Sequence, residues 1–229
     1  MESKIKDLRQ LIFNFGHNKS FQKNDFFISE SNYFAYELLM SWPKWEKKLV
    51  NIYGAKSSGK THLLEIFKQK NRAIKFEANN FSKDDLDKTN SEQNIILENL
   101  DNNFDENLIY TLIDLLEKQN KYLIITSKIS INLINIKLPD LKSRFKNCLN
   151  AEIKKPDDLL LQALIIKNLS DHQIILDSKL INFICKRITR SYDNITEFIC
   201  TIDKISLKKK KPINMKIIKE ILEDKFEKL

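Results

Sequence analysis

The sequence predicts an α/β fold, in which a parallel five-stranded sheet covered by helices is followed by a small all-α lid domain. In the first two thirds of the chain, short runs rich in β-branched and aromatic residues alternate with helical segments, as in parallel sheets. After Pro156, four helical segments follow one another with no strand between them. A chain of 229 residues is long enough for one domain and a smaller lid.

Five short apolar runs are the expected strands. They are LVNIY (49–53), AIKFE (73–77), NIIL (94–97), YLIITS (122–127) and CLNAEI (148–153). The segment SNYFAYELLM (31–40) has helical spacing, and Ser31 is placed to cap it. Trp42-Pro43 ends this helix, because proline disfavours helical backbone in the residue before it.

The change of pattern near residue 155 predicts three parts. We expect an extended arm over 1–20, an α/β domain over 21–155 and a helical lid domain over 156–229. The lid helices are PDDLLLQALIIKNLSD, SKLINFICKRIT, YDNITEFICTIDKIS and INMKIIKEILEDKFEK.

Composition indicates an ordinary globular protein, with 42% hydrophobic and 31% charged residues. No run approaches 18 apolar residues, and the N-terminus lacks the apolar core of a signal peptide. We therefore expect a cytoplasmic protein with no membrane partner. The net charge of +8 is compatible with nucleic-acid binding, although lysine is abundant throughout the chain. The densest basic run, 208–211, is interpreted as a solvated turn, with contact to DNA or an acidic partner as the alternative.

Cysteine and histidine usage argues against a metal or disulfide framework. Cys148, Cys185 and Cys200 are odd in number and widely spaced. Each lies in an apolar context, so buried thiols are predicted. The three histidines do not cluster with cysteines or carboxylates, and no structural metal is expected.

The stretch GAKSSGKT (54–61) matches the phosphate-loop pattern G-x-x-x-x-G-K-[ST] in full, and it follows an expected strand and precedes a helix. Two of the three glycines of the chain lie in it. Such glycines let backbone N–H groups point at phosphate oxygens, and the helix start adds partial positive charge. A glycine turn that binds nothing is the alternative. The predicted nucleotide-binding residues are Gly54, Ala55, Lys56, Ser57, Ser58, Gly59, Lys60, Thr61 and His62.

The loop predicts ADP or ATP with Mg²⁺ as cofactors. Lys60 is expected to reach the β- and γ-phosphates, and the Thr61 hydroxyl is expected to ligate Mg²⁺. Hydrolysis also needs an acidic residue on the next-door strand, and Glu98 in NIILENLD is the candidate for the metal. The alternative is a solvent-facing strand end. The next position, where a second carboxylate commonly prepares the attacking water, is Asn99, and an amide cannot accept a proton from water. Asp101 is expected to lie on the same face of the strand as Asn99. Intrinsic hydrolysis is therefore expected to be weak or absent.

Several motifs resemble the DnaA-related AAA+ family of bacterial replication proteins. GAKSSGKTHLL resembles the phosphate loop of this family, FFISESNYFAYELL its adenine-side segment, and LPDLKSRF (138–145) its LKSRF box. KKPDDLLLQALIIKNL and the helices after it resemble the lid. The resemblance covers roughly 8–224. It is closest to the Hda-type regulatory inactivators, because the chain ends after the last lid helix, where the initiator continues into a DNA-binding domain.

The resemblance implies roles for particular residues. Arg144 matches an arginine finger, which is supplied in trans to the ATP of a neighbouring subunit; an ordinary salt-bridged arginine is the alternative. Phe26 and Phe27 would lie beside the adenine ring, or are plain core residues. The sensor arginine of the family falls at Asp193, which is a departure that weakens the case for self-catalysed hydrolysis.

The start of the chain also carries a motif. QLIFNF (10–15) resembles the clamp-binding peptide of Hda proteins, although Phe13 stands where leucine is commoner. Packing on the protein's own core is the alternative. The predicted clamp-binding residues are Gln10, Leu11, Phe13 and Phe15.

Taken together, the resemblance implies a regulator of replication initiation. It would bind a nucleotide and the sliding clamp (the DNA polymerase III beta subunit), contact DNA only through the clamp, and stimulate ATP hydrolysis by the initiator DnaA, which prevents re-initiation. The formation of a homo-oligomer is left as an open alternative. The alternatives are a self-acting AAA+ ATPase of helicase-loader type and an accessory protein that delivers DnaA to the origin.

Overall fold

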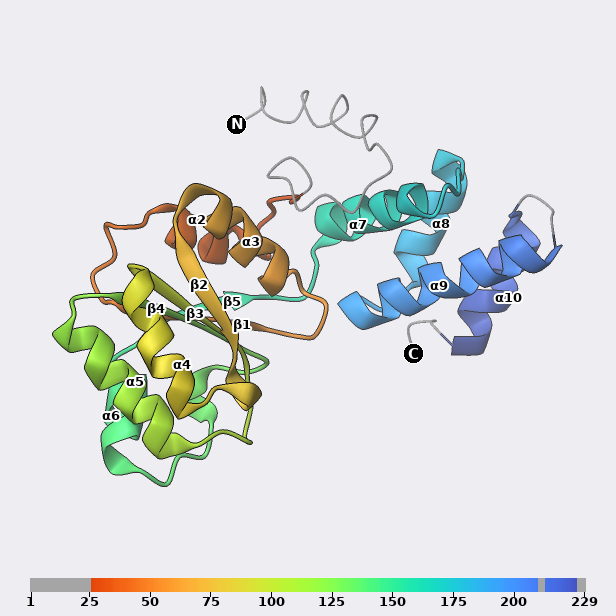
Figure 1. The fold of residues 1–229 in the computed structure, drawn as a ribbon. Helices are drawn as coiled ribbons and strands as arrows, with labels where there is room; N and C mark the ends of the chain where they lie inside the picture. The colour runs from red at the N-terminus through yellow and green to blue at the C-terminus, as the bar shows by residue number, and fades with distance from the viewer. Residues whose placement is uncertain (1–25, 210–212, 226–229) are drawn as a thin grey trace. The chain divides into compact units, whose positions relative to one another are not determined.

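The computed structural model describes residues 26–209 and 213–225 (Figure 1). These residues fall into two compact units. The α/β unit contains residues 32–154, and the helical unit contains the described residues before Asn32 and after Lys154. The arm predicted over 1–20 lies outside the described residues.

The α/β unit is built on a five-stranded parallel sheet in the order β2-β3-β4-β1-β5, which confirms the predicted fold class. The third strand is longer than NIIL (94–97), because it continues through an irregular step to Leu100. The strands are β1 (Leu49–Gly54), β2 (Ala73–Glu77), β3 (Asn94–Leu100), β4 (Tyr122–Ser127) and β5 (Leu149–Ile153).

Helices cover both faces of this sheet, with α2 and α3 on one side and α5 and α6 on the other (Figure 1). The central strands β3 and β4 are therefore buried on both faces, and their sequences read as continuous apolar runs. The helices are α2 (Tyr33–Met40), α3 (Lys60–Lys70), α4 (Lys83–Lys88), α5 (Glu106–Lys118) and α6 (Pro139–Lys146), with short 3-10 turns η2 (Ala78–Asn80), η3 (Thr89–Ser91) and η4 (Ile131–Leu133).

The start of α2 differs from the sequence prediction. Asn32 is the residue before the first turn, and Ser31 does not cap the helix. The Ser31 hydroxyl instead donates to the Asp157 carboxylate at 2.8 Å and accepts from the Asp157 N–H at 2.9 Å. Asp157 in turn caps the next helix of its own unit by accepting from the N–H of Leu160. The serine is thus used at the start of the helical unit.

The helical unit contains α7 (Asp158–Asp171), α8 (Ser178–Arg187), α9 (Tyr192–Lys209) and α10 (Met215–Lys225). Its core is made of apolar side chains from all four helices, including Ile165, Ile184, Phe198 and Ile218. None of the helices in the described part of the chain is long and apolar enough to cross a bilayer.

The cysteines are only partly as predicted. Cys148 is buried, but Cys185 is half-buried and Cys200 is exposed. Cys200 follows the buried pair Phe198 and Ile199 on α9, and the helical turn carries it past the core onto the outer face. Apolar neighbours in the sequence therefore did not guarantee burial.

Candidate nucleotide-binding site

The phosphate loop connects β1 to α3, so the strand–loop–helix context that the motif requires is present. Its two glycines are needed for different reasons. A Cβ on Gly54 would lie 2.6 Å from the carbonyl oxygen of Ile153 on the neighbouring strand β5, which is closer than real contacts. Gly59 has φ +94° at the start of α3, a left-handed conformation that strains any other residue. Ala55, Lys56 and Ser57 form the exposed tip of the loop.

Lys60 is a buried cation that the loop itself holds. Its ammonium donates to the carbonyl oxygens of Gly54 at 2.7 Å and Ala55 at 2.8 Å, and it lies 3.5 Å from the Ser58 hydroxyl. Carbonyl oxygens carry only partial charge, so phosphate oxygens are stronger acceptors for the same ammonium. The start of α3 adds N–H donors and a partial positive charge, which makes the loop suited to an anion.

Glu98 lies within reach of the loop although its strand is not next to β1. Glu98 was predicted to lie on the strand next to β1, but β4 lies between β1 and β3. Glu98 is nevertheless buried, and its Oε1 accepts a hydrogen bond from the Thr61 hydroxyl at 2.8 Å. A hydroxyl and a carboxylate oxygen are ligands that Mg²⁺ accepts in phosphate sites. Thr61 and Glu98 therefore fit the magnesium that the motif implies, and they would hold it together with the phosphates.

The second oxygen of Glu98 has a partner that the sequence analysis missed. Lys75 on β2 places its ammonium 3.0 Å from Glu98 Oε2 and 3.0 Å from Glu65 Oε1 on α3. Burial by itself lowers the pKa of Lys75, but the hydrogen bonds with Glu65 and Glu98 outweigh it and raise the pKa above its ordinary value. A lysine between Ile74 and Phe76 in a strand was the available signal, since ionisable residues are uncommon there.

Asn99 lies at an irregular step of β3. Its φ is +60°, and the pairing register between β3 and β4 shifts between Leu97 and Leu100. The Asn99 N–H donates to the Thr126 hydroxyl at 3.0 Å, and its side-chain amide donates to Glu77 at 3.0 Å. Asparagine tolerates this left-handed backbone better than most residues. The side chain is thus occupied by Glu77.

The irregular step also affects Asp101. The expectation that Asp101 faces as Asn99 does assumed regular alternation along the strand, which ends at the register shift. Asp101 follows the end of β3, where it accepts hydrogen bonds from the N–H of Asn103 and the amide of Asn79. These bonds hold the pKa of Asp101 below its ordinary value.

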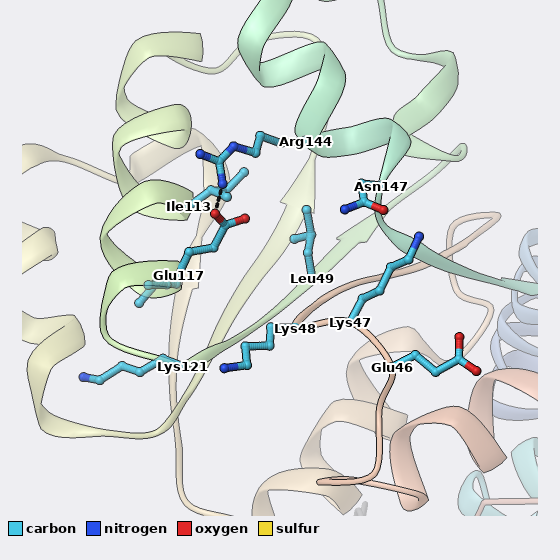
Figure 2. Close-up of a pocket in the computed structure, with 10 residues that line it drawn as sticks. Glu46, Lys47, Lys48, Leu49, Ile113, Glu117, Lys121, Arg144 and Asn147 are labelled. Carbon is cyan, nitrogen blue, oxygen red and sulfur yellow. Dashed lines mark ion pairs between the residues drawn. The ribbon is translucent and has the colours of Figure 1, made fainter.

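Arg144 lies on α6 at a different part of the α/β unit, beside a pocket of about 250 Å³ (Figure 2). Its guanidinium points at α5, where it pairs with Glu117 and lies 3.6 Å from Asp114. Its side chain is 28% exposed. Four cationic side chains and two carboxylates are among the residues that line the pocket, together with apolar side chains that include Leu49: Lys47, Lys48, Lys121, Arg144, Glu46 and Glu117.

Three other sets of predicted residues fall outside the unit formed by residues 32–154. Phe26 and Phe27 are half-buried and belong to the helical unit, not to the unit that carries the loop. Asp193 is exposed in the first turn of α9. The clamp-binding residues Gln10, Leu11, Phe13 and Phe15 lie outside the described residues. Among the described residues, no group of three or more His, Cys, Asp or Glu side chains could hold a metal ion by itself.

Comparison with curated proteins relates the sequence to replication initiators. The chain is 27% identical over 235 residues to the chromosomal replication initiator protein DnaA of Borrelia turicatae, covering 89% of this chain and 48% of that protein. It is 25% identical to the DnaA of Buchnera aphidicola, covering 90% of this chain and 53% of that protein. The chain spans about half the length of these relatives. No protein-family model matches it.

Solved structures show the same fold. Domain III of Thermotoga maritima DnaA has a TM-score of 0.72 at 18% identity, covering 94% of this chain and all of that domain. AMPPCP-bound DnaA from Aquifex aeolicus has a TM-score of 0.64 at 21% identity, covering 82% of this chain and 66% of that one. The T. maritima RuvB branch migration motor has a TM-score of 0.59 at 17% identity, covering 77% of this chain and 61% of that one. The fold is therefore that of DnaA domain III.

Proposed function

We propose that this protein regulates replication initiation by holding ADP or ATP in its phosphate loop, binding the sliding clamp through residues 10–15, and offering Arg144 to the ATP of a neighbouring DnaA molecule. The consequence is stimulated hydrolysis by the initiator and suppression of re-initiation. The similarity to DnaA proteins supports a role beside the initiator. The supporting observation within the chain is the arrangement of Lys60, Thr61 and Glu98 around one loop.

The catalytic part of the proposal concerns Arg144. An arginine that reaches the transferred phosphoryl group from a neighbouring subunit accelerates phosphoryl transfer by about 10³–10⁵-fold. Arg144 is supported in this role by its partial exposure and by the cationic side chains around it. The guanidinium would stabilise the charge that develops on the γ-phosphate of the initiator, so the nucleotide of this chain need not be hydrolysed.

The test measures ATP hydrolysis by DnaA with clamp-loaded DNA, with and without this protein. Arg144→Ala is expected to abolish the stimulation while leaving clamp and nucleotide binding unchanged. Lys142→Ala, which removes an exposed cation from the same helix, is the matched control and should stimulate as the wild type does. Undiminished stimulation by Arg144→Ala would remove the proposed mechanism.

The clamp part of the proposal is tested separately. A pull-down of the sliding clamp is expected to succeed with the full chain and to fail after deletion of residues 1–16. Replacing Gln10, Leu11, Phe13 and Phe15 together by alanine should reproduce the loss without shortening the chain. Retention of the clamp by both variants would show that the arm is not the binding element.

A self-acting ATPase is the second candidate, and one observation favours it. The hydroxyl of Thr61 and the carboxylate of Glu98 lie 2.8 Å apart, in the arrangement that a magnesium-dependent ATPase needs. This candidate predicts turnover by the isolated protein and its loss in Glu98→Gln. We expect no such turnover, because Asn99 cannot accept a proton and its amide is bonded to Glu77.

A further inference from the structure

Lys75 is a cation fixed against the carboxylate that would serve the nucleotide's metal. It lies on the edge strand β2, opposite Ile96, so Glu98 is its diagonal neighbour on the same face of the sheet. Long side chains reach across such diagonals. The Lys75 ammonium is 3.0 Å from Glu98 Oε2, and the Glu98 side chain is only 3% exposed.

Glu65 fixes the lysine from the other side. It projects from α3, the helix that begins at the loop, and its Oε1 lies 3.0 Å from the same ammonium. Two carboxylates from different elements therefore clamp one cation. The ammonium is consequently held near Glu98, although the Lys75 side chain is 30% exposed.

The two oxygens of Glu98 face different groups. Oε1 faces the Thr61 hydroxyl, on the side of the loop where a metal would be held, and Oε2 faces Lys75. A divalent cation binds a carboxylate mainly through its negative charge. A fixed positive charge 3.0 Å from a buried carboxylate offsets part of that attraction. Glu98 is thus a weaker metal ligand here than an unpaired carboxylate would be.

We propose that Lys75 is a positioning residue that balances the charge of Glu98 and makes nucleotide binding at this loop nearly independent of Mg²⁺. This inference rests on the proposed function, because it assumes that the loop binds a nucleotide. It adds that a residue of the chain itself balances part of the Glu98 charge, which a bound metal would otherwise neutralise. It also gives a second reason, besides Asn99, for a loop that holds a nucleotide without turning it over.

The experiment measures the affinity for fluorescently labelled ADP in excess EDTA and in excess Mg²⁺. For the wild type, we expect the two affinities to differ by less than about threefold. For Lys75→Met, Mg²⁺ should strengthen binding by about tenfold or more, which is the scale expected for one partly screened charge at this distance. Binding of Mn²⁺ to the ADP complex, followed by electron paramagnetic resonance, should strengthen in the same variant.

Three further variants make the test specific. Lys68→Met is the matched control, because Lys68 pairs with Glu65 at 3.7 Å and is the other lysine that pairs with that carboxylate. It should keep the wild-type ratio. Lys75→Arg keeps the charge and should also keep it. In Glu98→Gln, the additional substitution Lys75→Met should have no effect on the Mg²⁺ ratio, because the carboxylate that Lys75 balances is gone.

Lys75→Gln provides for the case in which Lys75→Met does not fold, because its amide retains a donor for both carboxylates while removing the charge. A wild-type Mg²⁺ ratio in every folded Lys75 variant would overturn this inference and leave the proposed nucleotide site intact. A strong Mg²⁺ requirement in the wild type would overturn it as well. If the wild type binds no nucleotide under either condition, the nucleotide part of the proposed function fails and this inference fails with it.

Discussion

Strand β1 carries a cationic site at each of its ends, and the two sites differ in how their charges are satisfied. At its last residue, Gly54 opens the phosphate loop, where buried Lys60 is held by backbone carbonyls. At its first residue, Leu49 lines the pocket of Arg144, whose carboxylate partners Asp114 and Glu117 are 33% and 50% exposed. Exposed pairs are weak and exchange with water or with other anions. In the proposed function, the loop end would keep a ligand and the pocket end would release the Arg144 side chain.

The largest expected effect concerns Cys148, which is buried next to the pocket end. Cys148 follows the pocket residue Asn147, and burial raises the pKa of its thiol to about 12. At pH 8 its thiolate fraction should be about a thousandfold below that of an ordinary cysteine. Iodoacetamide labelling followed by peptide mass spectrometry should therefore modify exposed Cys200 quickly and Cys148 only very slowly.

The same thiol gives a pH dependence whose sign can be worked out. An unfolded cysteine loses its proton near pH 9.0, and folded Cys148 does so near pH 12. The unfolded state therefore releases the proton first, and the stability that this group contributes below pH 9 declines as the pH rises towards 12. Rapid labelling of Cys148 at pH 8 would mean that the pocket end opens and exposes this thiol to the reagent.

The next effect tests whether the loop end keeps its ligand. Lys60→Ala removes the buried ammonium that would donate hydrogen bonds to phosphate oxygens. The loss of charge-assisted hydrogen bonds of this kind lowers the affinity by about 10- to 100-fold. Fluorescence titration with labelled ADP measures the loss. Lys83→Ala removes an exposed lysine from α4, outside the loop, and serves as the control, with an affinity close to that of the wild type. Equal losses in both variants would indicate only a general charge effect.

A stability measurement tests the backbone of the loop end. In Gly54→Ala, the new methyl group would meet the Ile153 carbonyl oxygen at 2.6 Å, so β1 or β5 must shift. We expect the free energy of unfolding to fall by about 1–3 kcal/mol, as for other overpacked positions. Urea unfolding measures it, with Lys56→Ala expected to stay within about 0.5 kcal/mol of the wild type. An unchanged midpoint for Gly54→Ala would show a looser loop than the one described.

The smallest effect concerns release at the pocket end. In the proposed function, Arg144 must leave Glu117 before it reaches the phosphate of a neighbour. Glu117→Gln weakens that pair and should raise the stimulation of DnaA hydrolysis by about two- to fivefold at limiting concentrations, in keeping with the modest strength of exposed pairs. Asp140→Asn removes an exposed carboxylate from α6 and should leave the rate unchanged. A lower rate in Glu117→Gln would mean that Glu117 orients Arg144 instead of restraining it.

Local patterns were sufficient for most of the fold. The strand at 122–127 and the strand at 73–77 have the predicted bounds, because each is a short apolar run between polar turns. Ser31 was misassigned for a reason that local patterns do not contain, since its hydroxyl bonds to Asp157, which is 126 positions away. The predicted burial of Cys200 was wrong because apolar neighbours in the sequence do not determine which face of a helix a residue occupies.

For the candidate site, the sequence alone determined the loop, because its spacing reflects local backbone needs at Gly54 and Gly59 and the chemistry of Lys60 and Thr61. Only the tertiary structure decided that β4 lies between β1 and β3, that Asn99 occupies an irregular step, and that Lys75 is bonded to Glu98. The same holds for the carboxylates of α5 that hold Arg144. These features depend on strand order and on contacts between distant segments, and neither leaves a period or a fixed spacing in the chain.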